Sequence, residues 1–189
     1  MTILILGLLV FFAVHSVRIV APGVRESVIA RRGAGAWRGI YSVISLVGLV
    51  LIVWGYGLAR QDPVVVYDPP YALRHLTMLL VLVAFVFLAV SQMPAGKLKP
   101  MLKHPMLAGL KLWALGHLLV NGDLASILLF GSFLVWAVVD RIAVKRRPGV
   151  VLPTPGPITN DIVAVVVGVL VYGLFVWKLH IWLIGVPVM

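Results

Sequence analysis

The sequence contains no cysteine among its 189 residues. Disulfides, cysteine-ligated iron–sulfur clusters and thiolate metal sites are therefore excluded, as is covalent haem attachment through a C-x-x-C-H motif. The chain also lacks G-x-x-x-x-G-K-[ST], G-x-G-x-x-G and H-E-x-x-H motifs and a Ser/His/Asp arrangement. These absences exclude the common nucleotide-binding, zinc-protease and hydrolase classes.

Charged residues are scarce. They make up 12% of the chain, against about a quarter in soluble domains, whereas 62% of the residues are hydrophobic. Only six residues are acidic, and Glu26 is the sole glutamate. This composition predicts an integral membrane protein in contact with a lipid bilayer.

Six apolar segments have lengths near the ~20 residues that cross the hydrocarbon core as a helix. They span Ile3–Val20, Gly39–Leu58, Leu73–Val90, Pro105–Val120, Leu124–Val139 and Ile162–Val186. No repeat or second domain is evident. We therefore predict a single all-α transmembrane domain, residues 1–189, built as a bundle of six transmembrane helices.

Lysine and arginine are distributed unevenly among the predicted loops. The first, third and fifth loops are rich in them, and the second and fourth carry only Arg60 and Arg74. The basic loops contain Arg18, Arg25, Arg31, Arg32, Arg38, Lys97, Lys99, Lys103, Arg141, Lys145, Arg146 and Arg147. Because basic loops stay in the cytoplasm, both termini are predicted to be periplasmic. The net charge of +10 is thus a topology signal, and we predict no nucleic-acid partner.

Three shorter segments have their own signals. The first apolar run lacks the preceding positive charge and the following A-x-A pattern of a signal peptide, so we interpret it as a membrane helix. Ala21–Arg38 mixes valine and isoleucine with arginine, which favours a short helix in the inner membrane interface. Pro148–Pro157 holds four prolines and is predicted to be a loop.

Histidines inside apolar segments are the first candidates for a functional site, because imidazole is costly in lipid. His15 lies near the inner end of the first segment, and His117 lies twelve residues after Pro105, about 18 Å along its helix. A neutral imidazole can ligate a metal or bond a neighbouring carbonyl. Both readings stay open for each histidine. His75 and His180 are interpreted as interfacial polar residues.

The polar residues of the fourth segment fall on two helix faces. His104 and Lys111 are seven residues apart and share one face, whereas Trp113 and His117 share another. The two groups are therefore predicted to serve different sites. Trp113 is placed to stack on a planar ligand or to pack in the core.

An ammonium group at Lys111 needs a partner inside the membrane. Asp140 and Asp161 are the candidate carboxylates within the chain. An anionic ligand, such as a haem propionate or a lipid phosphate, is the second alternative. Snorkelling toward the inner head groups is the third.

Four stretches together resemble the NnrU family of bacterial membrane proteins. They are VHS from Val14, WRGIYSVISLVGLVLIVWGY from Trp37, YDPP from Tyr67, and KHPMLAGLKLWALGHLLVNGDLAS from Lys103. The resemblance covers nearly the whole chain. It implies a multi-pass protein of the bacterial cell inner membrane, associated with nitrite and nitric oxide reduction in denitrification.

That family is similar in turn to zeta-carotene isomerase, a haem b membrane enzyme that isomerises a polyene. The resemblance implies non-covalent haem b, with His15 and His117 as the metal ligands. It places His104 at the histidine of an RHP motif, while Lys111 and Trp113 are candidate cofactor contacts. A hydrophobic polyene or isoprenoid substrate and a reductase or electron donor are the implied partners, and haem-dependent isomerase activity is the implied reaction.

One departure bears on that reaction. The isomerase has a cysteine three residues before its helix-four histidine, and this chain has Ala114 there. Ligand exchange with a thiolate is therefore excluded. Two alternatives stay open: an S-adenosylmethionine-dependent methyltransferase of the isoprenylcysteine type, which the HPM motif resembles, and a non-catalytic assembly partner of a reductase.

Overall fold

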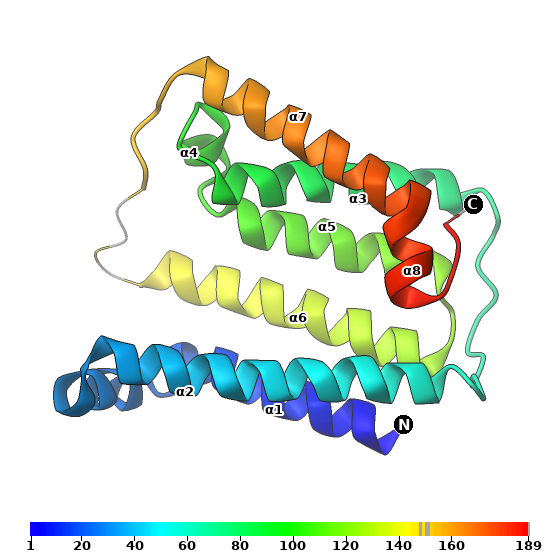
Figure 1. The fold of residues 1–189 in the computed structure, drawn as a ribbon, viewed down its shortest axis with the longest axis horizontal. Helices are drawn as coiled ribbons and strands as arrows, with labels where there is room; N and C mark the ends of the chain where they lie inside the picture. Colours follow the sequence, from blue (N-terminus) through cyan, green and yellow to red (C-terminus); the bar gives the residue numbers. More distant parts are fainter. Residues whose placement is uncertain (148, 150–151, 189) are drawn as a thin grey trace. The chain divides into compact units, whose positions relative to one another are not determined.

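The computed structural model describes residues 1–147, 149 and 152–188. These residues form helices and loops without a named strand, and the described chain has one isolated β-bridge, between Val65 and Asp123. The helices are α1 (Thr2–Val20), α2 (Pro22–Ala59), α3 (Leu73–Gln92), α4 (Leu98–Leu102), α5 (Pro105–Val120), α6 (Leu124–Arg146), α7 (Ile158–Leu174), the π-helical turn η1 (Phe175–Leu179) and α8 (His180–Ile184) (Figure 1).

The all-helical membrane class is confirmed. Each predicted segment coincides with helical structure, and five of these helices are long and apolar enough to cross a membrane. The sixth, α5, has 16 residues, or about 24 Å at ~1.5 Å per residue. It is shorter than the ~20 residues that a straight crossing needs.

The chain folds as two compact units. Unit 1 comprises Met1–Asp68 and Asn121–Ala143, and unit 2 comprises Pro69–Val120 and the described residues from Val144 onward. Unit 1 thus contains α1, α2 and most of α6, whereas unit 2 contains α3, α4, α5 and the C-terminal helices. The prediction of a single domain stays a prediction.

In unit 1, α1 and α2 pack side by side in antiparallel directions because glycines let their backbones approach (Figure 1). A Cβ atom at Gly48 would lie 2.8 Å from the backbone nitrogen of Phe11, and one at Gly55 would overlap the backbone of Leu4. Gly7 of α1 meets the α2 backbone in the same way. The contacts Leu4–Gly55 and Phe11–Gly48 are seven residues apart on each helix. Together they fix the register of α1 against α2.

The predicted interfacial helix is continuous with the second span except at one residue. Gly33 has φ 83° and ψ 163° inside α2, a conformation that is essentially restricted to glycine. The helix therefore breaks at Gly33, five residues before the boundary predicted at Arg38. Pro22 occupies its first turn, where a missing N–H costs nothing.

In unit 2, α3 packs against both α5 and α7. The Thr77 hydroxyl of α3 donates a 2.8 Å hydrogen bond to the carbonyl of Gly116 in α5. On the other side, a Cβ at Gly168 of α7 would lie 2.6 Å from the Cα of Val86. Small residues thus set both helix contacts of α3.

The loop between α3 and α4 is held by the first turn of α7. The Asp161 carboxylate, 5% exposed, accepts hydrogen bonds from the backbone N–H groups of Lys97 (2.7 Å) and Leu98 (3.1 Å). The Asn160 amide donates to the Ala95 carbonyl at 2.9 Å. Polar groups of α7 therefore satisfy backbone atoms of this partly buried loop.

The last predicted span begins earlier than expected and is interrupted. Helix α7 starts at Ile158, the π-helical turn η1 follows it, and the ribbon bends before α8 (Figure 1). Gly185, with φ 77°, ends α8 in a left-handed conformation. Of the predicted loop 148–157, residues 148, 150 and 151 lie outside the described residues, and residues 152–157 are not helical.

Candidate functional site

His15 is anchored to its own helix. Its Nδ1 atom lies 2.7 Å from the carbonyl oxygen of Phe11, one turn earlier in α1. Because a carbonyl oxygen only accepts, Nδ1 carries the proton in this bond and Nε2 carries the lone pair. The imidazole also stacks on the Phe11 ring, with centroids 4.0 Å apart and planes at 22°.

Aromatic side chains surround His15 within unit 1. The Tyr41 ring of α2 lies 5.1 Å from the imidazole, and the Trp136 ring of α6 meets it edge-on at 5.8 Å. The Trp136 indole donates a 3.1 Å hydrogen bond to the hydroxyl of Ser16. The sequence marks Ser16 only as the neighbour of His15, and it does not indicate that Tyr41 and Trp136 lie there.

His117 repeats the same local arrangement in unit 2. Its Nδ1 atom lies 2.8 Å from the carbonyl oxygen of Trp113, again one turn earlier. The Trp113 ring is tilted at 49° to the imidazole, with centroids 5.1 Å apart. The prediction that Trp113 and His117 share a face of α5 is thus confirmed.

The two Nδ1–carbonyl hydrogen bonds are compatible with both interpretations of His15 and His117. They give each imidazole a partner, as a purely structural role requires. They also fix the tautomer in the manner usual for metal-bound histidine, in which the second ring nitrogen donates to a carbonyl or carboxylate. His15 belongs to unit 1 and His117 to unit 2, and a metal shared between them stays a prediction.

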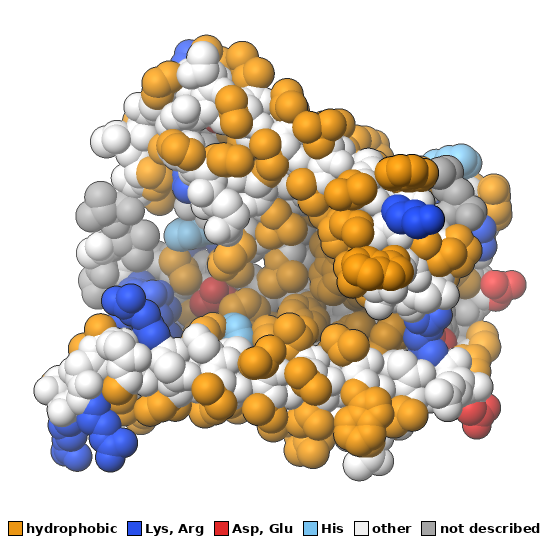
Figure 2. Space-filling view, viewed as in Figure 1, with side chains coloured by type: hydrophobic (Ala, Val, Ile, Leu, Met, Phe, Trp, Pro, Cys, Tyr) orange, Lys and Arg blue, Asp and Glu red, His pale blue; other side chains and the backbone are white. Residues whose placement is uncertain are grey.

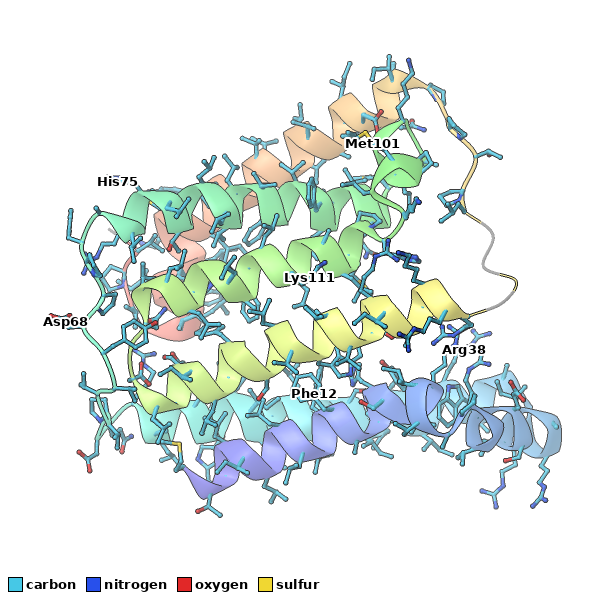
Figure 3. The ribbon with its side chains drawn as sticks, turned by 180° about the vertical axis from the view of Figure 1, so that it is seen from behind. Phe12, Arg38, Asp68, His75, Met101 and Lys111 are labelled. Carbon is cyan, nitrogen blue, oxygen red and sulfur yellow. The ribbon has the colours of Figure 1, made fainter. Side chains whose placement is uncertain are left out.

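His104 and Lys111 lie elsewhere on the α5 segment. His104 immediately precedes the helix, and Lys111 is half-buried midway along it (Figure 3). Lys103, just before them, has φ 62°, which places a non-glycine residue in a strained left-handed conformation. Asp161, one predicted carboxylate partner of Lys111, bonds the backbone of Lys97 and Leu98 instead.

One family model matches nearly the whole chain. The family model described as NnrU protein matches residues 3–188, a range that includes both histidines and all of α5. The chain belongs to the NnrU family. No curated protein and no solved structure matches it.

Among the residues of this NnrU-family chain that the structure describes, no group of three or more histidine, cysteine, aspartate or glutamate side chains is placed to hold a metal ion. Haem differs from a bare ion, because the porphyrin supplies four nitrogens and the protein supplies one or two axial ligands. Two separate histidines are therefore compatible with haem.

An open apolar groove of about 520 Å³ lies beside the His15 aromatic residues. Phe12 of α1 and Trp136 of α6 line it, together with Gly131 and Ser132. A Cβ added at Gly131 would meet no atom within 4 Å, so this glycine leaves open space. The groove offers room for an apolar molecule next to the polar edge of Trp136.

A second polar cluster of the NnrU-family chain was missed by sequence reasoning. The Tyr56 hydroxyl lies 2.9 Å from the hydroxyl of Ser126, which in turn donates to the Asp123 carboxylate at 2.6 Å. Asp123 also accepts the backbone N–H of Ser126 at 2.9 Å and so caps the start of α6. The D-x-x-S spacing at residues 123–126 is the signal that indicates this cap.

Proposed function

We propose that this membrane protein binds haem b non-covalently, and that His15 and His117 are the residues that would hold its iron. The observation that carries the proposal is the shared anchoring of both imidazoles, each of which donates from Nδ1 to the carbonyl one turn earlier. That bond orients the Nε2 lone pair away from the helix backbone and makes the imidazole a better donor to a metal. The absence of cysteine agrees with non-covalent attachment.

Other residues have distinct roles in this proposal. Lys111 lies on another face of α5 than His117, so it would contact the cofactor only through a propionate, which extends beyond the flat ring. The half-buried ammonium would balance that carboxylate, since a charge inside the membrane requires an opposite charge or water. His104, at the start of α5, would bind the same acidic edge. Trp113, tilted against His117, would pack on the flat face of the cofactor.

Haem would supply one-electron redox chemistry or, with one ligand displaced, a reactive iron centre. We propose that this chemistry serves either nitrite and nitric oxide reduction or the redox-linked isomerisation of a hydrophobic polyene or isoprenoid. The apolar groove beside Trp136 supports a lipid-soluble substrate near His15. Ala114 is fully buried and offers no ligand atom, which favours electron transfer from a donor or reductase over ligand exchange.

We also propose that the chain crosses the bacterial inner membrane six times, with both termini periplasmic. The uneven distribution of lysine and arginine between alternate loops supports this orientation. The short α5 would make the fourth crossing, with His104 near the cytoplasmic surface.

The test of haem binding is an absorption spectrum of the full-length protein, purified in detergent from haem-replete cells. We expect a Soret band and a shift on reduction with dithionite. The variants His15→Ala and His117→Ala should each lower the haem-to-protein ratio by about tenfold or more, because loss of an axial ligand costs at least as much as loss of a residue that supports one.

His75→Ala is the matched control, since it removes an imidazole of the same chain from a proposed interfacial position. It should retain the wild-type spectrum. A colourless wild-type protein would contradict the proposal. If that protein binds S-adenosylmethionine, the methyltransferase alternative replaces it; if it binds neither molecule and co-purifies with a reductase, the assembly-partner alternative does.

A further inference from the structure

The first eleven residues of α2, Pro22–Arg32, form a separate helical segment. It is bounded by Ala21 (φ −144°, ψ 61°) on one side and by Gly33 (φ 83°, ψ 163°) on the other. The full 38 residues of α2 would extend about 57 Å as one straight helix, almost twice the ~30 Å of the hydrocarbon core. Because the helix breaks at Gly33, the axis of Pro22–Arg32 can differ in direction from the axis of the rest of α2.

The segment carries its arginine and large apolar side chains on one side of the helix axis. At ~100° per residue, all its arginines and its three large apolar residues fall within an arc of about 160°. This arc contains Val24, Arg25, Val28, Ile29, Arg31 and Arg32. The opposite side carries Glu26, the only glutamate of the chain, with Gly23, Ser27 and Ala30.

Half of this arc is exposed. Val24 is 51% exposed, and Arg31 and Arg32 are also exposed, whereas Arg25, Val28 and Ile29 are half-buried. Within the described residues, no ion pair involves Arg25, Arg31 or Arg32. Figure 2 shows lysine and arginine side chains gathered at the end of unit 1 where this part of α2 lies.

We propose that Pro22–Arg32 lies in the plane of the membrane surface and binds the head groups of anionic phospholipids. Guanidinium groups pair with phosphate oxygens in a bidentate manner, and the neighbouring valine and isoleucine side chains enter the boundary between head groups and acyl chains. Glu26 points away from the lipid phosphates, which avoids repulsion. The segment is thus a lipid-binding helix, independent of any haem site.

The first test changes charge. Full-length protein is reconstituted with equal amounts of phosphatidylglycerol and phosphatidylcholine, and the lipids that stay bound are measured by native mass spectrometry. Each arginine near an anionic surface contributes about 1 kcal/mol to binding, so neutralising one should lower the preference for phosphatidylglycerol over phosphatidylcholine about fivefold. The triple variant Arg25→Gln, Arg31→Gln, Arg32→Gln should therefore lose most of the preference for phosphatidylglycerol, and Glu26→Gln should retain it.

The second test keeps the charge and changes the geometry. Gly33→Ala cannot adopt φ 83° and ψ 163° without strain, so the segment must leave its observed direction. We expect a loss of phosphatidylglycerol preference at unchanged net charge. Gly35→Ala is the matched control, because Gly35 is helical and a Cβ there meets no atom within 4 Å.

Circular dichroism verifies that each variant keeps its helical content, and the haem-to-protein ratio should be the same in all of them. An unchanged lipid preference in the triple variant would overturn the proposal. So would an equal loss in Gly33→Ala and Gly35→Ala, since the geometry of the segment would then be irrelevant.

Discussion

Three polar side chains within the apolar helices have a hydrogen-bond partner close by in the chain. The two histidines bond carbonyl groups one turn earlier, and Ser126 bonds Asp123 three residues earlier. In lipid, where water is absent, a local partner is the least costly way to satisfy such a group. The sequence therefore indicates where these groups lie, but their long-range neighbours depend on packing.

Ser126 provides the residue-scale prediction. It is fully buried and links the Tyr56 hydroxyl to the Asp123 carboxylate. Ser126→Ala should lower the free energy of unfolding by about 1–3 kcal/mol, since the half-buried Tyr56 hydroxyl and Asp123 carboxylate both lose a hydrogen bond. Thermal unfolding in detergent micelles, followed by circular dichroism, measures the loss.

Tyr56→Phe removes only the hydrogen bond between the Tyr56 and Ser126 hydroxyls. It should lower the free energy of unfolding by less, about 0.5–1.5 kcal/mol. The double variant should cost less than the sum of the two single variants, because both remove the same bond. Ser132→Ala, at the open groove of the same helix, is the control. Equal effects of Ser126→Ala and Ser132→Ala would show that the Tyr56–Ser126 contact does not contribute.

At the scale of elements, glycine decides how closely helices approach. The α2 face toward α1 carries Gly48, Ile52, Gly55 and Ala59, all buried and spaced by three or four residues. This spacing produces one flat stripe along the helix. The stripe is readable in the sequence, whereas its partner on α1 and the register of the pair come from the structure.

Gly55 gives the element-scale prediction. A Cβ there would overlap the backbone of Leu4, which cannot move aside like a flexible side chain. Gly55→Ala should therefore force α1 and α2 apart and destabilise unit 1 by about 1–3 kcal/mol. A lower midpoint of thermal unfolding in detergent would report this loss.

Gly57→Ala is the matched control two residues away on the same helix. A Cβ at Gly57 meets no atom within 4 Å, and alanine is favoured over glycine in a helix by about 0.5–1 kcal/mol. This variant should be as stable as the wild type or slightly more so. A Gly55→Ala protein as stable as Gly57→Ala would contradict the close approach.

At the scale of the whole molecule, the charge distribution predicts orientation. The chain has no cysteine, so single cysteines can be introduced without a background signal. Asp68, in the α2–α3 loop, and Met101, in the short helix α4, are both exposed. The charge distribution places these two connections on opposite sides of the membrane. Both are labelled in Figure 3.

In intact spheroplasts, a membrane-impermeant maleimide should label Asp68→Cys and leave Met101→Cys unlabelled. After the membrane is permeabilised, Met101→Cys should also be labelled. Labelling of Met101→Cys in intact spheroplasts, without labelling of Asp68→Cys, would reverse the proposed orientation.

The sequence by itself determined the membrane class and the approximate position of each long helix, because apolar length and breaker residues act locally. It did not indicate that the last helix begins at Ile158 or that η1 interrupts it. The break near the start of α2 was also readable as a change from basic to apolar composition, although only the structure placed it at Gly33. The division into two units was not readable, since a continuous helix, α6, crosses the boundary between them. No linker composition marks that boundary.

Candidate ligands were likewise identified by residue type, as imidazoles that lipid makes costly. Their environments were decided only by tertiary structure. Tyr41 and Trp136 reach His15 from α2 and α6 because helix packing, and not sequence distance, brings them there. Asp161 bonds the backbone of the α3–α4 loop because the packing of α7 on α3 places it within reach. Local patterns fix what each helix is, and the close approach of helices at small residues fixes which side chains meet.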